Sequence, residues 1–328
     1  MKAFVNVNAS SLDGAVDALV KARAAGRLAV IAGGGSDLLG LMKERLIQPD
    51  VVVNLKTIPS LNQVSVQEGA TRIGGLITLD ALARDPIVRE QYGVLADAAS
   101  KVGTPQIRNT GTLAGNVCQR PWCWYMRNGF PCYKNGGDRC FARNGENQHH
   151  AIFGQGPSYI VHPSDTAPAL VALDASFRLV GPGGERHVKA ADFFVMPTRR
   201  PRHENVLGDD EILAEVVIPS SPAGRRSTYE KVMDRESWTH AVVSVAVVLD
   251  MAGDLCRHAS IVLGGVAPVP LLRRDAAALL EGTRITDEVI ARVAAAVVAD
   301  ARPLSKNAYK VPLTRGIVRK TIAAIARG

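Results

Sequence analysis

The chain has 328 residues, of which 47% are hydrophobic and only 5% aromatic, and its formal net charge is +8. This length allows a substantial core and two or three domains, and its many Ala, Val and Gly residues suit a soluble, layered α/β or α+β protein. No apolar run approaches the roughly 20 residues that span a bilayer, and no basic run is interleaved with aromatic residues as in single-strand binders. We therefore expect no membrane insertion and no nucleic acid, and we interpret the basic surface as suited to an acidic partner.

The N-terminal residues lack the continuous apolar core of a signal peptide, so the sequence by itself predicts a cytoplasmic protein. Their apolar residues are spaced for an amphipathic helix that Ser10 or Ser11 can cap and that ends at Gly26. The expected apolar face of this helix consists of Val16, Leu19, Val20 and Ala22. Buried strands are expected next, over Leu28–Ala32 and Asp50–Leu55.

A glycine turn follows the first of these strands directly. The turn and the start of the next helix consist of Ala32, Gly33, Gly34, Gly35, Ser36, Asp37 and Leu38. A strand, a glycine turn and a helix start form the arrangement in which backbone amides bind a pyrophosphate. The spacing is neither G-x-G-x-x-G nor that of a P-loop, so neither a Rossmann nor an NTPase site is supported. Taken alone, three glycines are a weak signal, and a bare turn is the better interpretation.

A second stretch of small residues runs from Asn109 to Asn116. Small residues let backbone N–H groups approach an anionic ligand closely. The candidate ligand-binding residues of this second turn are Thr110, Gly111, Thr112, Gly115 and Asn116. Two such turns in one chain favour a phosphate-bearing cofactor over two unrelated bends.

Four of the five cysteines lie in one loop, residues 117–143, directly after the second turn. Cys118, Cys123, Cys132 and Cys140 follow the spacing C-x4-C-x8-C-x7-C, which is neither the ferredoxin run nor the paired C-x2-C of zinc ribbons. Spacing alone therefore leaves structural zinc and an iron–sulfur cluster both open. A neighbouring cofactor turn favours the cluster, because zinc cannot exchange electrons.

Other residues of this region have more ordinary interpretations. His149 and His150 could ligate a metal, but a polar loop pair is the commoner explanation. Cys256, on an expected strand, is interpreted as an inert core thiol. Trp122, Trp124 and Tyr125 are expected to shield the cysteines from water. Five basic residues are expected to stabilise a reduced cluster: Arg120, Arg127, Lys134, Arg139 and Arg143.

The remaining elements predict a larger lobe and a separate C-terminal domain. The expected hairpins pair Leu61–Gln67 with Ala70–Ile73, Ser176–Val180 with Arg186–Lys189, and Ala241–Asp250 with Cys256–Gly264, and Ile212–Ile218 is a further strand. One short helix is expected to begin at Thr78 or Asp80. Further helices are expected over Val94–Val102, Thr166–Leu173, Leu271–Leu280, Asp287–Ala299 and roughly Ala308–Ala326. Pro219–Arg226 is the best domain boundary by composition.

Four motifs together resemble the FAD-binding subunit of molybdenum hydroxylases, which include xanthine dehydrogenase, aldehyde oxidoreductase and carbon monoxide dehydrogenase relatives. These motifs are AGGGSDLL (Ala32–Leu39), IRNTGTLAGN (Ile107–Asn116), HPSD (His162–Asp165) and LGGVAPVP (Leu263–Pro270). The cysteine loop resembles that of the flavin subunit of bacterial periplasmic-type aldehyde oxidoreductases, which carries an extra [4Fe–4S] cluster. A cluster-bearing insertion also occurs in 4-hydroxybenzoyl-CoA reductase.

The resemblance implies an α+β fold, with an FAD-binding domain over 1–220 and a CO dehydrogenase flavoprotein-like domain over 225–328. The first domain would consist of lobes over about 1–56 and 57–220. Both glycine turns would hold FAD, Asp165 would contact its sugar-phosphate or ribityl region, and Lys231 would face the flavin. The four cysteines would hold the [4Fe–4S] cluster. Residues 235–240 lack the acidic residue that many relatives place before the following strand, which leaves the electron acceptor of the flavin open.

In function, the resemblance implies an electron-transfer subunit of a molybdenum-dependent aldehyde oxidoreductase. Its partners would be a molybdenum-cofactor subunit and a [2Fe–2S] subunit, which together pass electrons to FAD and an external acceptor. Export with a partner that carries a twin-arginine signal would make the protein periplasmic. Two alternatives stay open: the same subunit in a 4-hydroxybenzoyl-CoA reductase-like enzyme, with reversed electron flow, and a zinc-stapled nucleotide-binding protein without a redox role. The chain is expected to hold no substrate-activating residues of its own.

Overall fold

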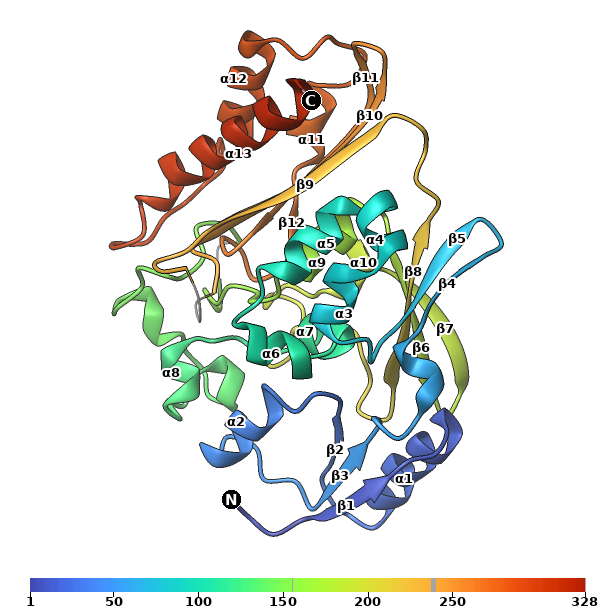
Figure 1. The fold of residues 1–328 in the computed structure, drawn as a ribbon. Helices are drawn as coiled ribbons and strands as arrows, with labels where there is room; N and C mark the ends of the chain where they lie inside the picture. Colours follow the sequence, from blue (N-terminus) through green and yellow to red (C-terminus); the bar gives the residue numbers. More distant parts are fainter. Residues whose placement is uncertain (155, 237–239, 328) are drawn as a thin grey trace.

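A computed structural model describes residues 1–154, 156–236 and 240–327. It consists of three sheets with helices packed on them, arranged from an N-terminal sheet at one end to a C-terminal domain at the other (Figure 1). The predicted α+β fold is confirmed. Within the described residues, no helix is long and apolar enough to cross a membrane. Residues 237–239, which belong to the stretch discussed for the flavin's acceptor, lie outside the described residues.

The N-terminal sheet has three parallel strands in the order β1-β3-β2. Strands β2 (Ala29–Ala32) and β3 (Val51–Asn54) confirm the two predicted strands, although only β3 is buried and β2 is half-buried. Strand β1 (Val5–Asn8), four residues long, was not predicted. Helix α1 (Leu12–Ala24) packs on this sheet, and α2 (Leu38–Lys43) follows the first glycine turn.

Helix α1 begins as predicted but buries a slightly different face. The Ser11 hydroxyl accepts a hydrogen bond of 3.1 Å from the Gly14 amide, which caps the helix. Its buried residues are Ala15, Val16, Leu19 and Ala22. Val20 is 37% exposed, so its placement on the apolar face was wrong, since a helix turns about 100° per residue and Leu19 already occupies the centre of that face.

The central sheet is antiparallel, in the order β4-β5-β8-β6-β7. Its strands are β4 (Val64–Gln67), β5 (Ala70–Gly74), β6 (Ser176–Gly181), β7 (Gly184–Lys189) and β8 (Ile212–Pro219), and they confirm the predicted hairpins. The associated helices are α3 (Leu79–Arg84), α4 (Pro86–Gln91), α5 (Gly93–Ser100), α6 (Pro105–Thr110), α7 (Leu113–Val117), α9 (Thr166–Ala172) and α10 (Ala190–Phe193), with a 3-10 turn over Pro59–Asn62. Their apolar faces and this sheet share one core.

The C-terminal domain has a four-stranded sheet in the order β12-β11-β10-β9, covered by helices. Strands β10 (Val243–Ala252) and β11 (Leu255–Gly264) confirm the predicted hairpin, and helices α12 (Asp287–Ala296) and α13 (Lys310–Arg327) lie close to the predicted ranges. The predicted helix over Leu271–Leu280 is instead a short strand, β12 (Leu271–Leu272), followed by α11 (Arg274–Ala278).

Strand β9 (Arg225–Val232) begins within the stretch that composition marked as a linker. Its sequence, RRSTYEKV, is almost wholly polar, so no apolar alternation predicted a strand there. The strand forms because it pairs with β10 and lies against α5, where Thr228 donates to Asp97 over 3.0 Å. Polar side chains are therefore used here to dock the C-terminal domain on the central one.

Candidate cofactor cleft and cysteine segment

The two glycine turns lie in direct contact. A Cβ atom on Gly34 would lie 2.0 Å from the carbonyl oxygen of Thr110 and 2.9 Å from the Cα atom of Gly111. A Cβ atom on Gly33 would lie 2.9 Å from the Thr112 hydroxyl oxygen. No side chain fits at Gly34 without moving backbone, so this residue lets the N-terminal sheet dock on the second turn.

The second turn is a tight connection between two short helices, α6 and α7. The Thr112 hydroxyl caps α7 by accepting a hydrogen bond of 3.2 Å from the Gly115 amide. The Gly111 carbonyl accepts from the Leu79 amide over 2.9 Å, and the Leu113 amide donates to the Ile77 carbonyl over 3.0 Å. Hydrogen bonds to the connection between β5 and α3 thus hold the turn in place.

A cleft opens between the two turns, α6 and the start of α9, and its empty space, including the part open to solvent, is about 840 Å³. Seven predicted site residues line it: Ser36, Asp37, Gly111, Thr112, Gly115, Asn116 and Asp165. The other predicted residues, Ala32, Gly33, Gly34, Gly35, Leu38, Thr110 and Lys231, do not line it. The glycines among them act instead by allowing the turns to meet.

Eight further residues line the cleft and were not predicted to bind the cofactor: Leu79, Val102, Gly103, Ile107, Gln119, Trp122, Pro163 and His240. Most of them are apolar, and an apolar residue next to a helix is ordinarily read as part of the core. The one available signal was position, because Val102 and Gly103 lie in the short connection between α5 and α6, the helix that leads into the second turn. A largely apolar cleft with a few polar groups suits a flat, ring-bearing ligand.

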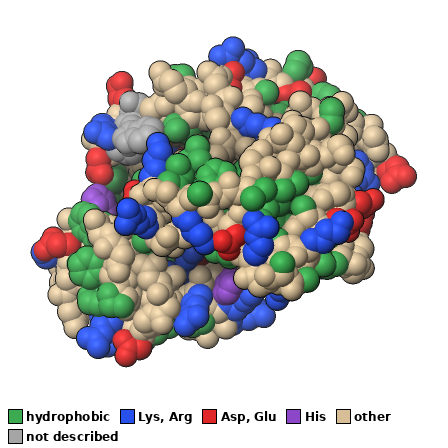
Figure 2. Space-filling model, turned by 90° about the horizontal axis from the view of Figure 1, so that it is seen from below, with side chains coloured by type: hydrophobic (Ala, Val, Ile, Leu, Met, Phe, Trp, Pro, Cys, Tyr) green, Lys and Arg blue, Asp and Glu red, His purple; other side chains and the backbone are tan. Residues whose placement is uncertain are grey.

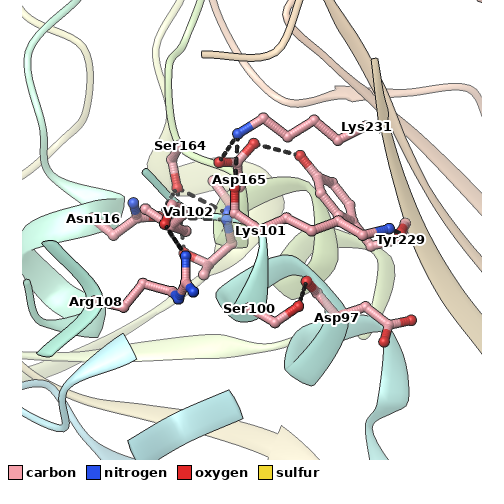
Figure 3. A network of polar contacts seen from close by, with 12 residues as sticks. Asp97, Ser100, Lys101, Val102, Arg108, Asn116, Ser164, Asp165, Tyr229 and Lys231 are labelled. Carbon is pink, nitrogen blue, oxygen red and sulfur yellow. Dashed lines mark hydrogen bonds and ion pairs between the residues drawn. The ribbon is translucent and has the colours of Figure 1, made fainter. Parts of the chain in front are cut away.

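Asn116 fixes the far wall of the cleft rather than pointing a free amide into it. Its side-chain oxygen accepts hydrogen bonds from the Ser164 hydroxyl over 2.6 Å and from the Thr166 hydroxyl over 2.7 Å. These three side chains are buried, and Figure 3 shows Asn116 and Ser164 turned toward each other. The contact ties α7 to the start of α9, so that both elements keep the cleft open.

Asp165 and Lys231 form a buried ion pair of 2.7 Å that joins α9 to β9, with side chains that are 4% and 0% exposed. The Tyr229 hydroxyl donates to the same carboxylate over 2.6 Å, and burial together with this carboxylate raises the pKa of Tyr229. Lys231 also donates to the Lys101 carbonyl over 2.9 Å (Figure 3). Lys231 thus contacts Asp165 and the end of α5, which places it behind the wall of the cleft.

Asp37 links the first glycine turn to the cysteine segment, residues 117–151. Its carboxylate pairs with Arg127 over 2.8 Å and accepts from the Arg120 amide over 3.1 Å. The Arg127 guanidinium lies 4.3 Å above the ring of Trp122, and the His240 ring lies 5.1 Å from it. Asp37 and Arg127 therefore hold Trp122 against the mouth of the cleft.

The cysteine segment has little regular structure. It contains one short helix, α8 (Trp124–Arg127), and 3-10 turns over Tyr133–Asn135 and Phe141–Arg143. Side-chain contacts define the rest, such as the Tyr125 hydroxyl that accepts from the Glu146 amide over 2.6 Å. Rings of Tyr125, Phe130 and Phe141 pack together with centroids 5.1–6.1 Å apart.

Two other cysteines of this segment influence the pKa of Cys123. Burial raises the pKa of Cys123 to about 11, and the thiols of Cys140 and Cys132 raise it further, against amides of Met126 and Tyr125 that lower it. Burial alone raises the pKa of Cys118 to about 12, and this residue packs against the core of the central sheet. Cys256 lies buried on β11, as predicted for a core thiol.

The described residues contain no set of three or more Cys, His, Asp or Glu side chains arranged to hold a metal ion. The predicted ligands are therefore not gathered around one point. A [4Fe–4S] cluster is wider than one ion, so its thiolates stand farther apart than the ligands of zinc, which bind at about 2.3 Å. Thiols are the type of donor that such a cluster requires, and the segment contains four of them.

The predicted role of the basic residues needs correction for three of the five. Arg120 and Lys134 each pair with buried Glu204 over 2.9 Å, and Arg127 pairs with Asp37. Each of the three cations thus has a carboxylate partner, with Arg120 and Lys134 sharing Glu204, because a cation buried among protein atoms needs a partner. These three residues therefore hold the segment in place through ion pairs.

Two family models match the chain. The FAD-binding domain in molybdopterin dehydrogenase matches residues 3–221, and the CO dehydrogenase flavoprotein C-terminal domain matches residues 227–325. The aldehyde oxidoreductase FAD-binding subunit of Escherichia coli K12 is 33% identical, with 88% of this chain and 89% of that protein covered. The carbon monoxide dehydrogenase medium chain of Hydrogenophaga pseudoflava is 28% identical, with 90% and 88% covered.

A solved structure of carbon monoxide dehydrogenase from Hydrogenophaga pseudoflava, in a form that lacks the Mo-pyranopterin moiety, has the same fold. It matches with a TM-score of 0.78 and 26% identity, and the match covers 98% of this chain and 96% of that one. The apolar cleft between two touching glycine turns fits the FAD that the family model names. The chain therefore belongs to the FAD-binding subunits of the molybdenum hydroxylase family.

Proposed function

We propose that this chain is the FAD-binding and iron–sulfur electron-transfer subunit of a molybdenum-dependent aldehyde oxidoreductase. FAD would lie in the cleft, with its pyrophosphate at Ser36 of the first glycine turn, which Gly33–Gly35 shape, and at Gly111, Thr112 and Gly115 of the second. The apolar residues Leu79, Val102 and Ile107 would cover its rings. When bound, FAD supplies two-electron chemistry, and the chain binds and orients it.

The observation that carries the redox role is the position of Trp122. This residue lines the cleft, and it also lines a second pocket together with Cys123 and His150. Pro163 and His240 also line both pockets, so the proposed flavin site and the pocket beside Cys123 are neighbours that share three lining residues. Cys118, Cys123, Cys132 and Cys140 remain the proposed ligands of a [4Fe–4S] cluster, which supplies one-electron chemistry when bound.

The proposed partners are a molybdenum-cofactor subunit and a [2Fe–2S] subunit. The names of two relatives describe an FAD-binding subunit and a medium chain, which are parts of larger enzymes. Lys and Arg side chains stand around hydrophobic ones on one face of this protein (Figure 2), and such a face suits an acidic partner. Electrons from aldehyde oxidation at the molybdenum subunit would pass through [2Fe–2S] centres to FAD and an external acceptor.

Cofactor analysis tests the cluster. Protein purified anaerobically should contain one FAD and about four irons per chain. Cys132→Ser should lose most of the iron, and Cys256→Ser is the matched control that should keep it. Stoichiometric zinc without iron would contradict the proposal.

Coexpression tests the partners. The isolated chain should oxidise no aldehyde, although dithionite should reduce its flavin. Aldehyde oxidation should appear when molybdenum and [2Fe–2S] subunits copurify with the chain, as followed by size-exclusion chromatography and by assays with several electron acceptors. Aldehyde turnover by the isolated chain would rule out the proposed division of labour.

A further inference from the structure

His150 lies directly against one of the proposed cluster ligands. Its Nε2 atom is 3.3 Å from the Cys123 sulfur, and the residue is only 4% exposed. The neighbouring His149 differs, because its side chain is 49% exposed and lies 4.0 Å from an Asp234 oxygen. The two histidines were predicted to form one polar loop pair, but in the structure His150 is buried and His149 is exposed.

Burial identifies which ring nitrogen of His150 carries the proton. A neutral imidazole has one N–H group, on either Nδ1 or Nε2. Its Nδ1 atom is buried and has no hydrogen-bond partner within the part of the chain that the structure describes. A proton on Nδ1 would be a buried donor without an acceptor, which is costly, whereas a proton on Nε2 points at the Cys123 sulfur.

The C-terminal domain holds the backbone of this histidine in place. The Asn307 side chain donates to the carbonyl of His150 over 3.1 Å, and the Lys310 ammonium donates to the carbonyl of His149 over 2.9 Å. The rings of Trp124 and Tyr125 lie beside the imidazole, with centroids 6.4 Å and 6.1 Å away. The imidazole is thus held by both domains and has little freedom to turn away from the sulfur.

We propose that His150 is a positioning residue of the cluster site, whose Nε2–H group donates a hydrogen bond to the Cys123 thiolate. This inference rests on the proposed function. The Cys123 sulfur already has the Met126 and Tyr125 amides near it, and His150 adds a third donor. Hydrogen bonds to cluster sulfurs stabilise the more negative, reduced state, so His150 raises the reduction potential of the cluster.

Two substitutions test this bond in the complete, anaerobically purified protein. His150→Phe keeps a ring but removes the donor, and His150→Gln keeps an N–H group. His149→Gln is the matched control, one residue away on the exposed side. The measurements are iron and FAD per chain, the reduction potential from a redox titration followed by EPR, and the rate of iron loss to a chelator.

All three variants should bind FAD and retain about four irons per chain. His150→Phe should lower the reduction potential of the cluster and weaken iron retention about 10- to 100-fold, as expected for the loss of a partner of a metal ligand. His150→Gln should restore part of the potential, and His149→Gln should match the wild type.

An unchanged potential in His150→Phe would overturn the inference while leaving the proposed function intact. Loss of iron from both His150 variants, to the extent seen in Cys132→Ser, would show instead that His150 is itself a ligand. Absence of iron from the wild-type protein would overturn the proposed function and this inference together.

Discussion

The cofactor cleft and the cysteine segment are neighbours built by different means. Backbone contacts define the cleft: the Thr110 carbonyl lies where a Gly34 side chain would be, and main-chain bonds hold the second turn to residues 75–79. Side chains define the cysteine segment, where Asp37, Arg127 and Tyr125 hold loops with little regular structure. A site made of backbone depends on a few small residues, whereas a site made of side chains depends on distant partners. The following predictions test this difference.

The largest expected effect is at Gly34, where the backbone of the two turns meets. Gly34→Val should abolish FAD binding and separate the N-terminal sheet from the second turn, because its Cβ atom alone would lie 2.0 Å from the Thr110 oxygen. The destabilisation should exceed the about 1–3 kcal/mol of an ordinary overpacked core, since backbone must move. FAD per chain and thermal unfolding measure it. Gly40→Ala in α2 is the control, since nothing lies within 4 Å of its added methyl.

The buried ion pair behind the cleft should be nearly as sensitive. Lys231→Met leaves the Asp165 carboxylate buried without its cation, which should cost about 3–5 kcal/mol in denaturant unfolding. The double variant Asp165→Asn with Lys231→Met should recover part of this loss, because the unpaired charge is gone. Lys189→Met breaks an exposed pair with Asp174 and should change stability by less than about 1 kcal/mol. Equal losses from Lys231→Met and Lys189→Met would show that burial of the pair is unimportant.

The stability of the protein should depend on pH through Lys310, which holds the cysteine segment to the C-terminal domain. Burial lowers the pKa of Lys310, whose ammonium holds the carbonyls of His149 and Gly265, from 10.5 to about 7. Between these values the unfolded chain binds one proton more than the folded chain, so Lys310 makes stability rise with pH by about 1.4 kcal/mol per unit. Below about pH 7 both states are protonated and this contribution to the slope vanishes.

Unfolding of wild type and Lys310→Met should therefore be compared at several pH values. The difference between the two free energies of unfolding should grow by about 3 kcal/mol in favour of the wild type from about pH 7.5 to 9.5. Because the cysteines and tyrosines titrate in both proteins, their contributions cancel in the difference between the two free energies of unfolding. Parallel pH curves for the two proteins would mean that Lys310 keeps an ordinary pKa.

The smallest expected effect is at the link between the two regions. Asp37→Asn removes the charge opposite Arg127, whose side chain is only 7% exposed, and should cost about 1–2 kcal/mol and weaken FAD binding modestly. Asp80→Asn breaks a pair with Arg84, which is 77% exposed, and should cost less than about 0.5 kcal/mol. If Asp37→Asn leaves both stability and FAD affinity unchanged, the two regions are held together by other contacts.

The same difference explains which parts of the molecule were predictable. The Ser11 cap, the strands on either side of the first turn and both glycine turns follow from residues within a few positions of each other. Strand β9 could not be predicted from its own residues, because these polar residues form a strand only when it pairs with β10 and lies against α5. Val102 and Ile107 were not predicted as site residues, because only the packing of the two turns against α9 places them on the wall of the cleft.

The sequence by itself determined the glycine turns, the main hairpins and the presence of four thiols in one segment. It did so because backbone conformation and helix capping depend on neighbours in the chain. The tertiary structure alone decided that Lys231 pairs with Asp165, that Cys118 faces the core, and that His150 lies against Cys123. Those contacts join residues brought together only when the domains pack, and no local pattern records which buried polar group will meet which partner.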